Sequence, residues 1–192
     1  MMNGLEMTPK LTFIFSSMNS GKTLALLTKN FMLREKGYST LLVKPELDNR
    51  TSTISSRIGL EEQCQLISID SLISTGIDPI NHNIDFILVD EAQFLTRDQV
   101  WDLSNMVDYF GINVICYGLK LNWKAELFEG SQALFELADE LIQMDSICKE
   151  TGNPALFHYK HGGSEASIET GFENLYSTVS RKVWKEMKLK GS

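Results

Sequence analysis

The sequence lacks the features that would place the chain in a membrane or outside the cell. No stretch approaches the roughly 18 consecutive apolar residues of a membrane-spanning helix, and the opening MMNGLEMTPK has no basic segment followed by an apolar one, as a signal peptide would. Cysteine is scarce: Cys64, Cys116 and Cys148 are odd in number and widely spaced, so we expect buried free thiols rather than disulfides. These absences predict a cytoplasmic protein with no membrane partner.

Basic charge is also in short supply. The chain has 18 lysines and arginines against 25 acidic residues, interspersed along its length, and its net charge is −7. Nucleic-acid binders concentrate basic side chains to neutralise phosphates, so no DNA or RNA partner is expected. At 192 residues, 43% hydrophobic and without internal repeats, the chain suits one globular domain with a small appendage.

Short apolar runs alternate with helix-like stretches, which is typical of a parallel sheet covered by helices. The predicted strands are Leu11–Phe15, Thr40–Val43, Gln65–Ile69, Asp85–Val89 and Asn113–Tyr117. The predicted helices are Lys22–Lys36, a segment that begins at a Thr96–Gln99 capping box and ends at Gly111, Ser131–Met144, and Val179–Leu189.

Beyond Cys148, glycine and proline break the chain into short pieces, at Gly152, Pro154, Gly162 and Gly163. We therefore predict two domains. Residues 1–145 would form a nucleotide-binding α/β domain, and residues 146–192 a small lobe that ends in a helix.

The segment SSMNSGKT follows the first predicted strand and opens the first predicted helix. It matches the phosphate-binding pattern G-x-x-x-x-G-K-[ST] except at its first position, where Ser16 replaces glycine. The loop N–H groups would face nucleotide phosphates, Lys22 would reach the β- and γ-phosphates, and Thr23 would ligate Mg²⁺. The alternative is that SGKT opens an ordinary helix by chance. The predicted nucleotide-binding residues of this loop are Ser16, Ser17, Met18, Asn19, Ser20, Gly21, Lys22 and Thr23.

The stretch FILVDEAQF, residues 86–94, is the second candidate element of a nucleotide site. Four apolar residues followed by Asp90 predict a buried strand that delivers a carboxylate to the edge of the sheet where nucleotides bind. Asp90 would complete the Mg²⁺ site with Thr23, and Glu91 would be free to act as a base. The alternative is a solvated strand end whose acids cap the following helix.

Further stretches carry a family resemblance. They are KPELDNR (44–50), SSRIGLE (55–61), VDEAQFLTRDQVWDLSNMVD (89–108) and CYGLKLNWKAELFEGS (116–131). With the phosphate loop, they resemble thymidine kinases of the zinc-bearing P-loop class, most closely the enterobacterial and phage branch, whose loop begins with alanine or serine. The resemblance spans about Leu11 to Trp184. It implies an α/β fold with a P-loop (RecA-like) parallel sheet, flanking helices, a small C-terminal lobe and a lasso-type loop.

The resemblance implies transfer of the γ-phosphoryl group of ATP to the 5′-hydroxyl of thymidine or deoxyuridine, giving dTMP in pyrimidine salvage. Glu91 would be the proton acceptor, and Asp48, Arg50 and Gln93 would lie at the nucleotide site with Asp90. The implied thymidine-binding residues are Phe94, Leu119, Trp123, Phe128, Gly171 and Tyr176. A homodimer or homotetramer and feedback inhibition by dTTP are implied as well.

The chain departs from this family in its small lobe, where the resemblance implies four zinc ligands. Cys148 is present, but Glu150 and Thr151 occupy the possible positions of its partner, and Ser180 and Val183 stand where the second pair belongs. One soft ligand cannot hold structural zinc, so zinc is predicted to be absent.

Two histidines offer a substitute for the missing ligands. Cys148, His158 and His161 form a C-x₉-H-x₂-H trio of unfamiliar spacing, and exposed loop histidines are the favoured interpretation. Phe172 replaces a glycine in the segment expected to clasp thymidine, which motivates the alternative of a catalytically impaired nucleotide-binding relative. A generic P-loop ATPase acting on nucleic acid is the third hypothesis, and the acidic net charge counts against it.

Overall fold

A six-stranded parallel sheet forms the centre of the computed structural model, which describes residues 8–46, 52–67, 83–162 and 175–190. Its strands are β1 (Leu11–Ser16), β2 (Thr40–Pro45), β5 (Gln65–Ile67), β6 (Phe86–Val89), β7 (Asn113–Leu119) and β8 (Glu140–Gln143). They lie in the order β5-β2-β6-β7-β1-β8, and all neighbouring pairs are parallel. The predicted strands are confirmed where they are described, with ends that differ by at most two residues, and the predicted end of the third strand at Ile69 lies outside the described residues.

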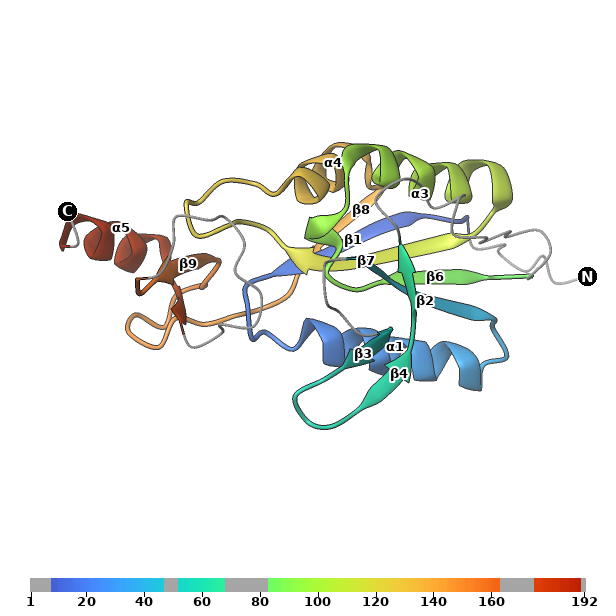
Figure 1. Ribbon diagram of the computed structural model, residues 1–192, viewed down its shortest axis with the longest axis horizontal. Helices are drawn as coiled ribbons and strands as arrows, with labels where there is room; N and C mark the ends of the chain where they lie inside the picture. Colours follow the sequence, from blue (N-terminus) through green and yellow to red (C-terminus); the bar gives the residue numbers. More distant parts are fainter. Residues whose placement is uncertain (1–7, 47–51, 68–82, 163–174, 191–192) are drawn as a thin grey trace, which may run out of the picture.

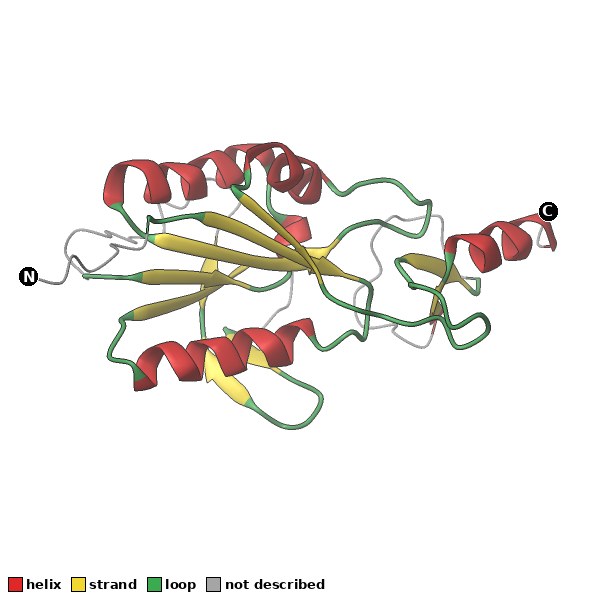
Figure 2. Ribbon diagram, turned by 180° about the vertical axis from the view of Figure 1, so that it is seen from behind, coloured by secondary structure: helices red, strands yellow, loops and turns green. Residues whose placement is uncertain are grey.

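Helices cover both faces of this sheet. Helix α1 (Lys22–Glu35) lies on one face, and α3 (Arg97–Phe110) and α4 (Glu129–Leu137) lie on the other (Figures 1 and 2). Along β6, Phe86 and Leu88 join the core on the α1 side, whereas Ile87 and Val89 join the core under α3 and α4. Successive side chains of a strand point to opposite faces, so a strand buried on both sides is apolar throughout.

The predicted capping box at the start of α3 is confirmed. The Thr96 hydroxyl accepts a hydrogen bond from the Gln99 N–H at 3.2 Å, and the Gln99 side chain accepts one from the Thr96 N–H at 2.9 Å. The helix ends at Gly111, whose φ of 69° lies in the left-handed region that glycine adopts without strain.

The prediction of one helix over Ser131–Met144 is wrong in its second half. Helix α4 ends at Leu137, and residues 140–143 form strand β8, parallel to β1. Asp139 enforces the turn: its carboxylate accepts the Leu11 N–H at 2.8 Å, and its own N–H donates to the Leu11 carbonyl at 2.9 Å. Apolar residues at 134, 137 and 141 satisfy helical spacing, but sequence periodicity does not show this long-range pairing.

The small lobe lies beyond the carboxyl ends of the sheet strands (Figure 1). It contains β9 (Phe157–Lys160) paired antiparallel with β10 (Tyr176–Val179), followed by α5 (Arg181–Lys190). The predicted Val179–Leu189 helix therefore begins two residues later than expected. Where residues 146–190 are described, their buried apolar cluster is Cys148, Ala155, Val179 and Val183.

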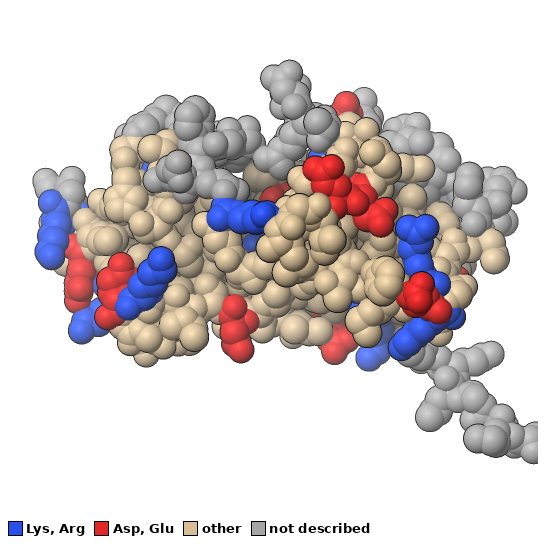
Figure 3. Space-filling model, turned by 90° about the horizontal axis from the view of Figure 1, so that it is seen from below, with Lys and Arg blue, Asp and Glu red and all other residues tan. Residues whose placement is uncertain are grey.

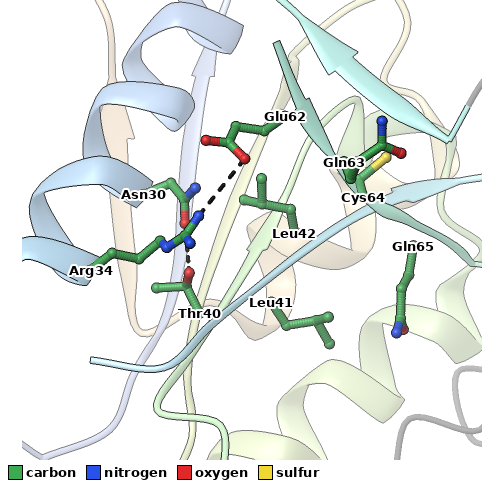
Figure 4. Close-up of a pocket in the computed structure, with 9 residues that line it drawn as sticks. All are labelled: Asn30, Arg34, Thr40, Leu41, Leu42, Glu62, Gln63, Cys64 and Gln65. Atoms are coloured by element: carbon green, nitrogen blue, oxygen red, sulfur yellow. Dashed lines mark hydrogen bonds and ion pairs between the residues drawn. The ribbon is translucent and has the colours of Figure 1, made fainter. Parts of the chain in front are cut away.

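A short hairpin of β3 (Thr53–Ser55) and β4 (Glu61–Gln63) lies beside α1. Figure 4 shows the open pocket between this hairpin, α1 and β2, in which Arg34 pairs with Glu62 at 3.8 Å and the Thr40 hydroxyl donates to Asn30 at 2.6 Å. The Arg34–Glu62 pair joins the hairpin to α1, whereas the Thr40–Asn30 bond joins β2 to α1.

The surface carries both signs of charge. On the face shown in Figure 3, basic and acidic side chains are interspersed.

Within the described ranges, no helix has the length and apolar character needed to cross a membrane.

Candidate active site

The backbone conformation at the first position of the phosphate loop allows serine in place of glycine. Ser16 is the last residue of β1 and pairs with Leu119, so its backbone is extended and does not need glycine. Its buried hydroxyl donates to the Met144 carbonyl at 3.0 Å. The left-handed residues of the loop are Asn19, with φ of 60°, and Gly21, with φ of 83°. Glycine is therefore retained only where the chain turns into α1.

Lys22 begins α1 and its ammonium folds back over the loop. Nζ donates to the Ser17 carbonyl at 2.5 Å and lies 3.4 Å from the Ser20 hydroxyl. Burial lowers the pKa of Lys22 from its ordinary value, while the negative charges of Glu91 and Asp90 act in the opposite direction. The ammonium thus lies within electrostatic reach of both carboxylates.

Thr23 and Asp90, 67 residues apart in sequence, meet at the carboxyl edge of the sheet. The Thr23 hydroxyl donates to Asp90 Oδ2 at 3.1 Å. Burial raises the pKa of Asp90 to about 6, and the charge of Glu91 adds to this, against opposing contributions from the Glu91 N–H, Thr23 and Lys22. An incompletely compensated carboxylate beside a hydroxyl is a pair of hard oxygen donors that suits Mg²⁺.

Glu91 follows Asp90 in a left-handed conformation, with φ of 52°. Such backbone strain in a residue other than glycine concentrates at functional sites. Gln93, buried in the short 3₁₀ helix η2 (Ala92–Phe94), donates through Nε2 to Glu91 Oε2 at 2.5 Å. The amide oxygen of Gln93 accepts the Leu119 N–H at 2.9 Å. Gln93 therefore fixes the Glu91 carboxylate relative to the end of β7.

Two glycines give η2 the room it needs, and sequence reasoning missed both. A Cβ at Gly118 would lie 3.0 Å from Gln93 Oε1 and 3.1 Å from the Gln93 nitrogen. A Cβ at Gly130, in α4, would lie 2.5 Å from the Ala92 carbonyl and 2.7 Å from that of Leu95. The signal that could have found them is their position inside a strand and a helix, where glycine is otherwise unfavourable.

The predicted nucleoside-binding residues lie on several elements. Phe94 and Phe128 form an edge-to-face pair with ring centroids 5.7 Å apart. The Trp123 ring lies beneath the ammonium groups of Lys124, Lys160 and Lys188, at 5.3, 5.5 and 4.6 Å from its centroid.

Tyr176, in β10, lies close to Trp123, because the Lys160 ammonium lies 5.8 Å from the centroid of the Tyr176 ring as well as near the Trp123 ring. Leu119 ends β7, and its carbonyl accepts the Ser131 hydroxyl at 2.6 Å. Asp48, Arg50, Gly171 and Phe172 lie outside the described residues.

The chain is similar to known proteins over most of its length. A profile of the thymidine kinase family matches residues 9–184. The chain belongs to the thymidine kinase family. A thymidine kinase of Xanthomonas axonopodis pv. citri is 40% identical over 189 residues, covering 93% of this chain and 90% of the relative.

Two further relatives extend this similarity. Thymidine kinases of Photobacterium profundum and Salmonella choleraesuis are 37% and 35% identical, and cover 92% and 95% of the chain and 97% and 94% of the relatives. Among solved structures, the replication initiator DnaA bound to AMPPCP and single-stranded DNA is distantly similar, at 14% identity and a TM-score of 0.43 over 71% of this chain and 40% of that one. The parallel sheet and its phosphate loop themselves identify the fold class.

The positions where the thymidine kinase resemblance implies zinc ligands lie together in the small lobe. Cys148 donates through Sγ to Glu150 Oε2 at 3.0 Å, and it shares an apolar cluster with Val183. Burial and the hydrogen bond to the Glu150 carboxylate raise the pKa of the Cys148 thiol, but hydrogen bonds from Thr151 and from the Ser180 and Glu150 backbones lower it more, so the net shift is downward. Within the described ranges, no group of three or more His, Cys, Asp or Glu side chains is placed to hold a metal.

The histidines differ from the expectation of two exposed loop residues. His161 is exposed, and its Nε2 lies 2.6 Å from the Ser177 hydroxyl. His158 is buried in β9 and bonds the phosphate loop, because its Nε2 lies 2.9 Å from the Met18 nitrogen. The expectation is therefore wrong for His158.

Proposed function

We propose that this chain is an ATP:thymidine 5′-phosphotransferase, which converts thymidine or deoxyuridine and ATP to the nucleoside 5′-monophosphate and ADP in pyrimidine salvage. The observation that carries the proposal is the meeting of Thr23, Asp90 and the oriented Glu91 at the end of a phosphate loop, in a chain of the thymidine kinase family. Phosphoryl transfer is mainly positioning and charge stabilisation, and this arrangement supplies both.

The phosphate loop would bind ATP. Its backbone N–H groups and the N-terminus of α1 favour negative charge, and Lys22 is poised to exchange its Ser17 contact for the β- and γ-phosphates. Thr23 and Asp90 would hold Mg²⁺, which when bound neutralises charge on the phosphate oxygens. The raised pKa of Asp90 supports this assignment, since the buried carboxylate lacks a full counter-charge.

Glu91 would accept the proton of the nucleoside 5′-hydroxyl. Gln93 directs the carboxylate from the side of β7, whose last residue, Leu119, is a proposed wall of the nucleoside pocket. Phe94, Phe128, Trp123 and Tyr176 would provide the aromatic surfaces that suit a flat pyrimidine. Because Glu91 is fixed before substrate binds, little reorganisation is needed when the hydroxyl arrives.

The remaining parts of the proposal rest on composition and resemblance. We propose Asp48 and Arg50 as nucleotide-site residues, Gly171 as a thymidine contact, dTTP as a feedback inhibitor, and a homodimer or homotetramer in the cytoplasm. A net charge of −7 supports the absence of a nucleic-acid partner. Val183 and Ser180 around Cys148 support a small lobe without structural zinc.

The test is an assay of the purified full chain with Mg²⁺, ATP and each nucleoside in turn. We expect dTMP from thymidine, and ADP release that depends on the nucleoside. ATP binding without dTMP or dUMP would instead support the impaired nucleotide-binding relative, which Phe172 and the altered zinc-ligand positions motivate. ADP release stimulated by DNA or RNA, and not by nucleosides, would support the generic ATPase.

A further inference from the structure

The phosphate loop is fastened to the chain beyond β8 by four side-chain hydrogen bonds. Ser16 donates to the Met144 carbonyl at 3.0 Å, and the Ser17 and Ser146 hydroxyls bond at 2.7 Å. Met18 is held at both ends: its N–H donates to His158 Nε2 at 2.9 Å, and its carbonyl accepts the Thr178 hydroxyl at 3.3 Å. The strands of the small lobe thus support the loop directly.

His158 has a single protonation pattern that fits its partners. A backbone N–H can only donate, so Nε2 must accept from Met18 and carries no proton. Nδ1 lies 3.1 Å from the Leu121 carbonyl, which can only accept, so the ring proton is on Nδ1. Only 3% of the residue is exposed. Both ring nitrogens are therefore used, and neither is left to bind a substrate or a metal.

The two partners of His158 belong to different halves of the proposed site. Met18 precedes Asn19, which adopts the left-handed conformation that shapes the phosphate loop. Leu121 lies two residues beyond Leu119 and two before Trp123, both proposed nucleoside contacts. The His158 imidazole therefore connects the phosphate loop to the segment that carries Leu119 and Trp123, here called the nucleoside wall.

Trp184 also restrains the backbone of His158 relative to the nucleoside wall. Trp184 of α5 donates through Nε1 to the His158 carbonyl at 3.1 Å, and the same N–H lies 3.3 Å from the Trp123 carbonyl. The peptide of His158 and that of Trp123 are thereby held at a common point. This leaves the imidazole little freedom to move relative to the nucleoside wall.

We propose that His158 is a positioning residue for the ATP site, which holds the Met18 peptide so that the loop N–H groups face the phosphates. This inference rests on the proposed function, because it assigns the loop to ATP. It makes ATP affinity depend on an imidazole of the small lobe that touches neither substrate. The effect should fall on ATP binding more than on turnover at saturating ATP.

Two amide substitutions separate the bonds of His158. The carboxamide of His158→Gln lies near the place of Nε2 and can accept from Met18, whereas that of His158→Asn lies near Nδ1 and can reach only Leu121. We expect His158→Asn to weaken ATP binding about tenfold, the effect of losing roughly one buried hydrogen bond. His158→Gln should stay within about threefold of wild type. His161→Asn, an exposed neighbour on the same segment, is the matched control.

The dissociation constant of Mg-ATP, measured by calorimetry, is the primary readout, with the ATP KM and kcat beside it. Equal effects of the Asn and Gln substitutions, or none, would overturn the proposal. Should His158→Asn fail to fold, ¹⁵N NMR of the wild-type ring still decides, since a proton on Nε2 excludes the bond from Met18. A wild type that binds ATP but makes neither dTMP nor dUMP contradicts the proposed function, while the affinity series still tests His158.

Discussion

The end of β6 and the small lobe both face the phosphate loop, but they bury titratable groups in opposite states. At the end of β6, burial raises the pKa of Asp90 to about 6, and at neutral pH the carboxylate is charged beside Glu91. In the small lobe, burial lowers the pKa of His158 to about 4, with the charge of Lys22 acting in the same direction, so the ring is neutral and fully bonded. On the proposed assignments, the charged carboxylate would receive a cation, whereas the neutral histidine would hold the backbone of the phosphate loop in place.

In the small lobe, hydrogen bonds and apolar packing surround Cys148. Thr151 and the Ser180 backbone bond the Cys148 sulfur, and Val183 packs beside it. These are the positions at which the family resemblance implies zinc ligands. We propose that these contacts stabilise the small lobe in place of a metal.

The largest effect is expected from placing cysteines at the zinc-ligand positions of the small lobe, which would turn it into a second cation-binding region. With Cys148, the triple substitution Thr151→Cys, Ser180→Cys and Val183→Cys gives two C-x₂-C pairs around one point, and four thiolates suit Zn²⁺. We expect about one zinc per chain, with an apparent binding free energy on the order of 10 kcal/mol at pH 7. Metal analysis and Co²⁺ absorbance measure it.

Adding Cys148→Ser to the triple variant is the control and should weaken binding sharply. Zinc in the wild-type protein at the same stoichiometry would show that other groups hold a metal. Failure of the triple variant to bind would show that the four positions are not close enough to share an ion.

The second test removes the proposed base at the end of β6. Glu91→Gln keeps the shape of the side chain but cannot accept a proton, so kcat should fall by about 10²- to 10⁴-fold while ATP affinity stays near that of wild type. Steady-state kinetics and ATP binding measure the two effects. Glu62→Gln, an acid of the exposed hairpin, is the control and should retain activity. Unchanged turnover in Glu91→Gln would remove Glu91 from its assigned role.

The parallel sheet and its charged edge could be predicted from the sequence because both depend on local patterns. Apolar runs identify buried strands, and the carboxyl ends of parallel strands share one edge, so Thr23 and Asp90 could be paired across 67 residues. Strand β8 could not be predicted in this way, because its formation depends on pairing with a distant part of the chain. Asp139 turns the chain into β8 by bonding Leu11, and residues 140–143 have apolar spacing that also fits a helix.

The role of His158 was hidden for a similar reason. Its glycine-rich surroundings predict an exposed loop, and no local pattern shows that β9 pairs with β10 and contacts the phosphate loop. Gln93 was expected at the nucleotide site, but nothing in its segment indicates that its amide bonds Glu91 and Leu119. Contacts that position other groups depend on the assembled fold, whereas the proposed reacting groups lie in short sequence motifs.

The third test uses pH to separate Asp90 from His158 in Mg²⁺-free buffer. The folded state holds the Asp90 proton more tightly than the unfolded state, whose ordinary value is 3.8, so this group adds stability as the pH falls through about 6. The unfolded state takes up the His158 proton first, at an ordinary value of 6.5, so this group loses stability as the pH falls from there towards about 4. The two contributions oppose each other in the wild-type protein.

Single substitutions should therefore reveal each contribution. Between pH 7 and pH 4.5, Asp90→Asn should lose about 2 kcal/mol more of its unfolding free energy than wild type, and His158→Gln should lose about 2 to 3 kcal/mol less. Urea unfolding at both pH values measures the difference. Parallel pH profiles for wild type and both variants would mean that neither group is perturbed as described.

The smallest expected effect lies at Trp123, where the nucleoside wall meets the small lobe. Trp123→Phe keeps an aromatic face but offers a weaker one to the ammonium groups of Lys124, Lys160 and Lys188, a change worth about 0.5 to 1 kcal/mol. We expect the thymidine KM to change by about two- to fivefold with ATP affinity unaffected, as measured by initial rates at saturating ATP. Trp101→Phe, on the exposed side of α3, should leave both constants unchanged. A change in ATP affinity in Trp123→Phe would show that the Trp184 contact to Trp123 transmits to His158 and the phosphate loop, and would join the two regions that the other tests separate.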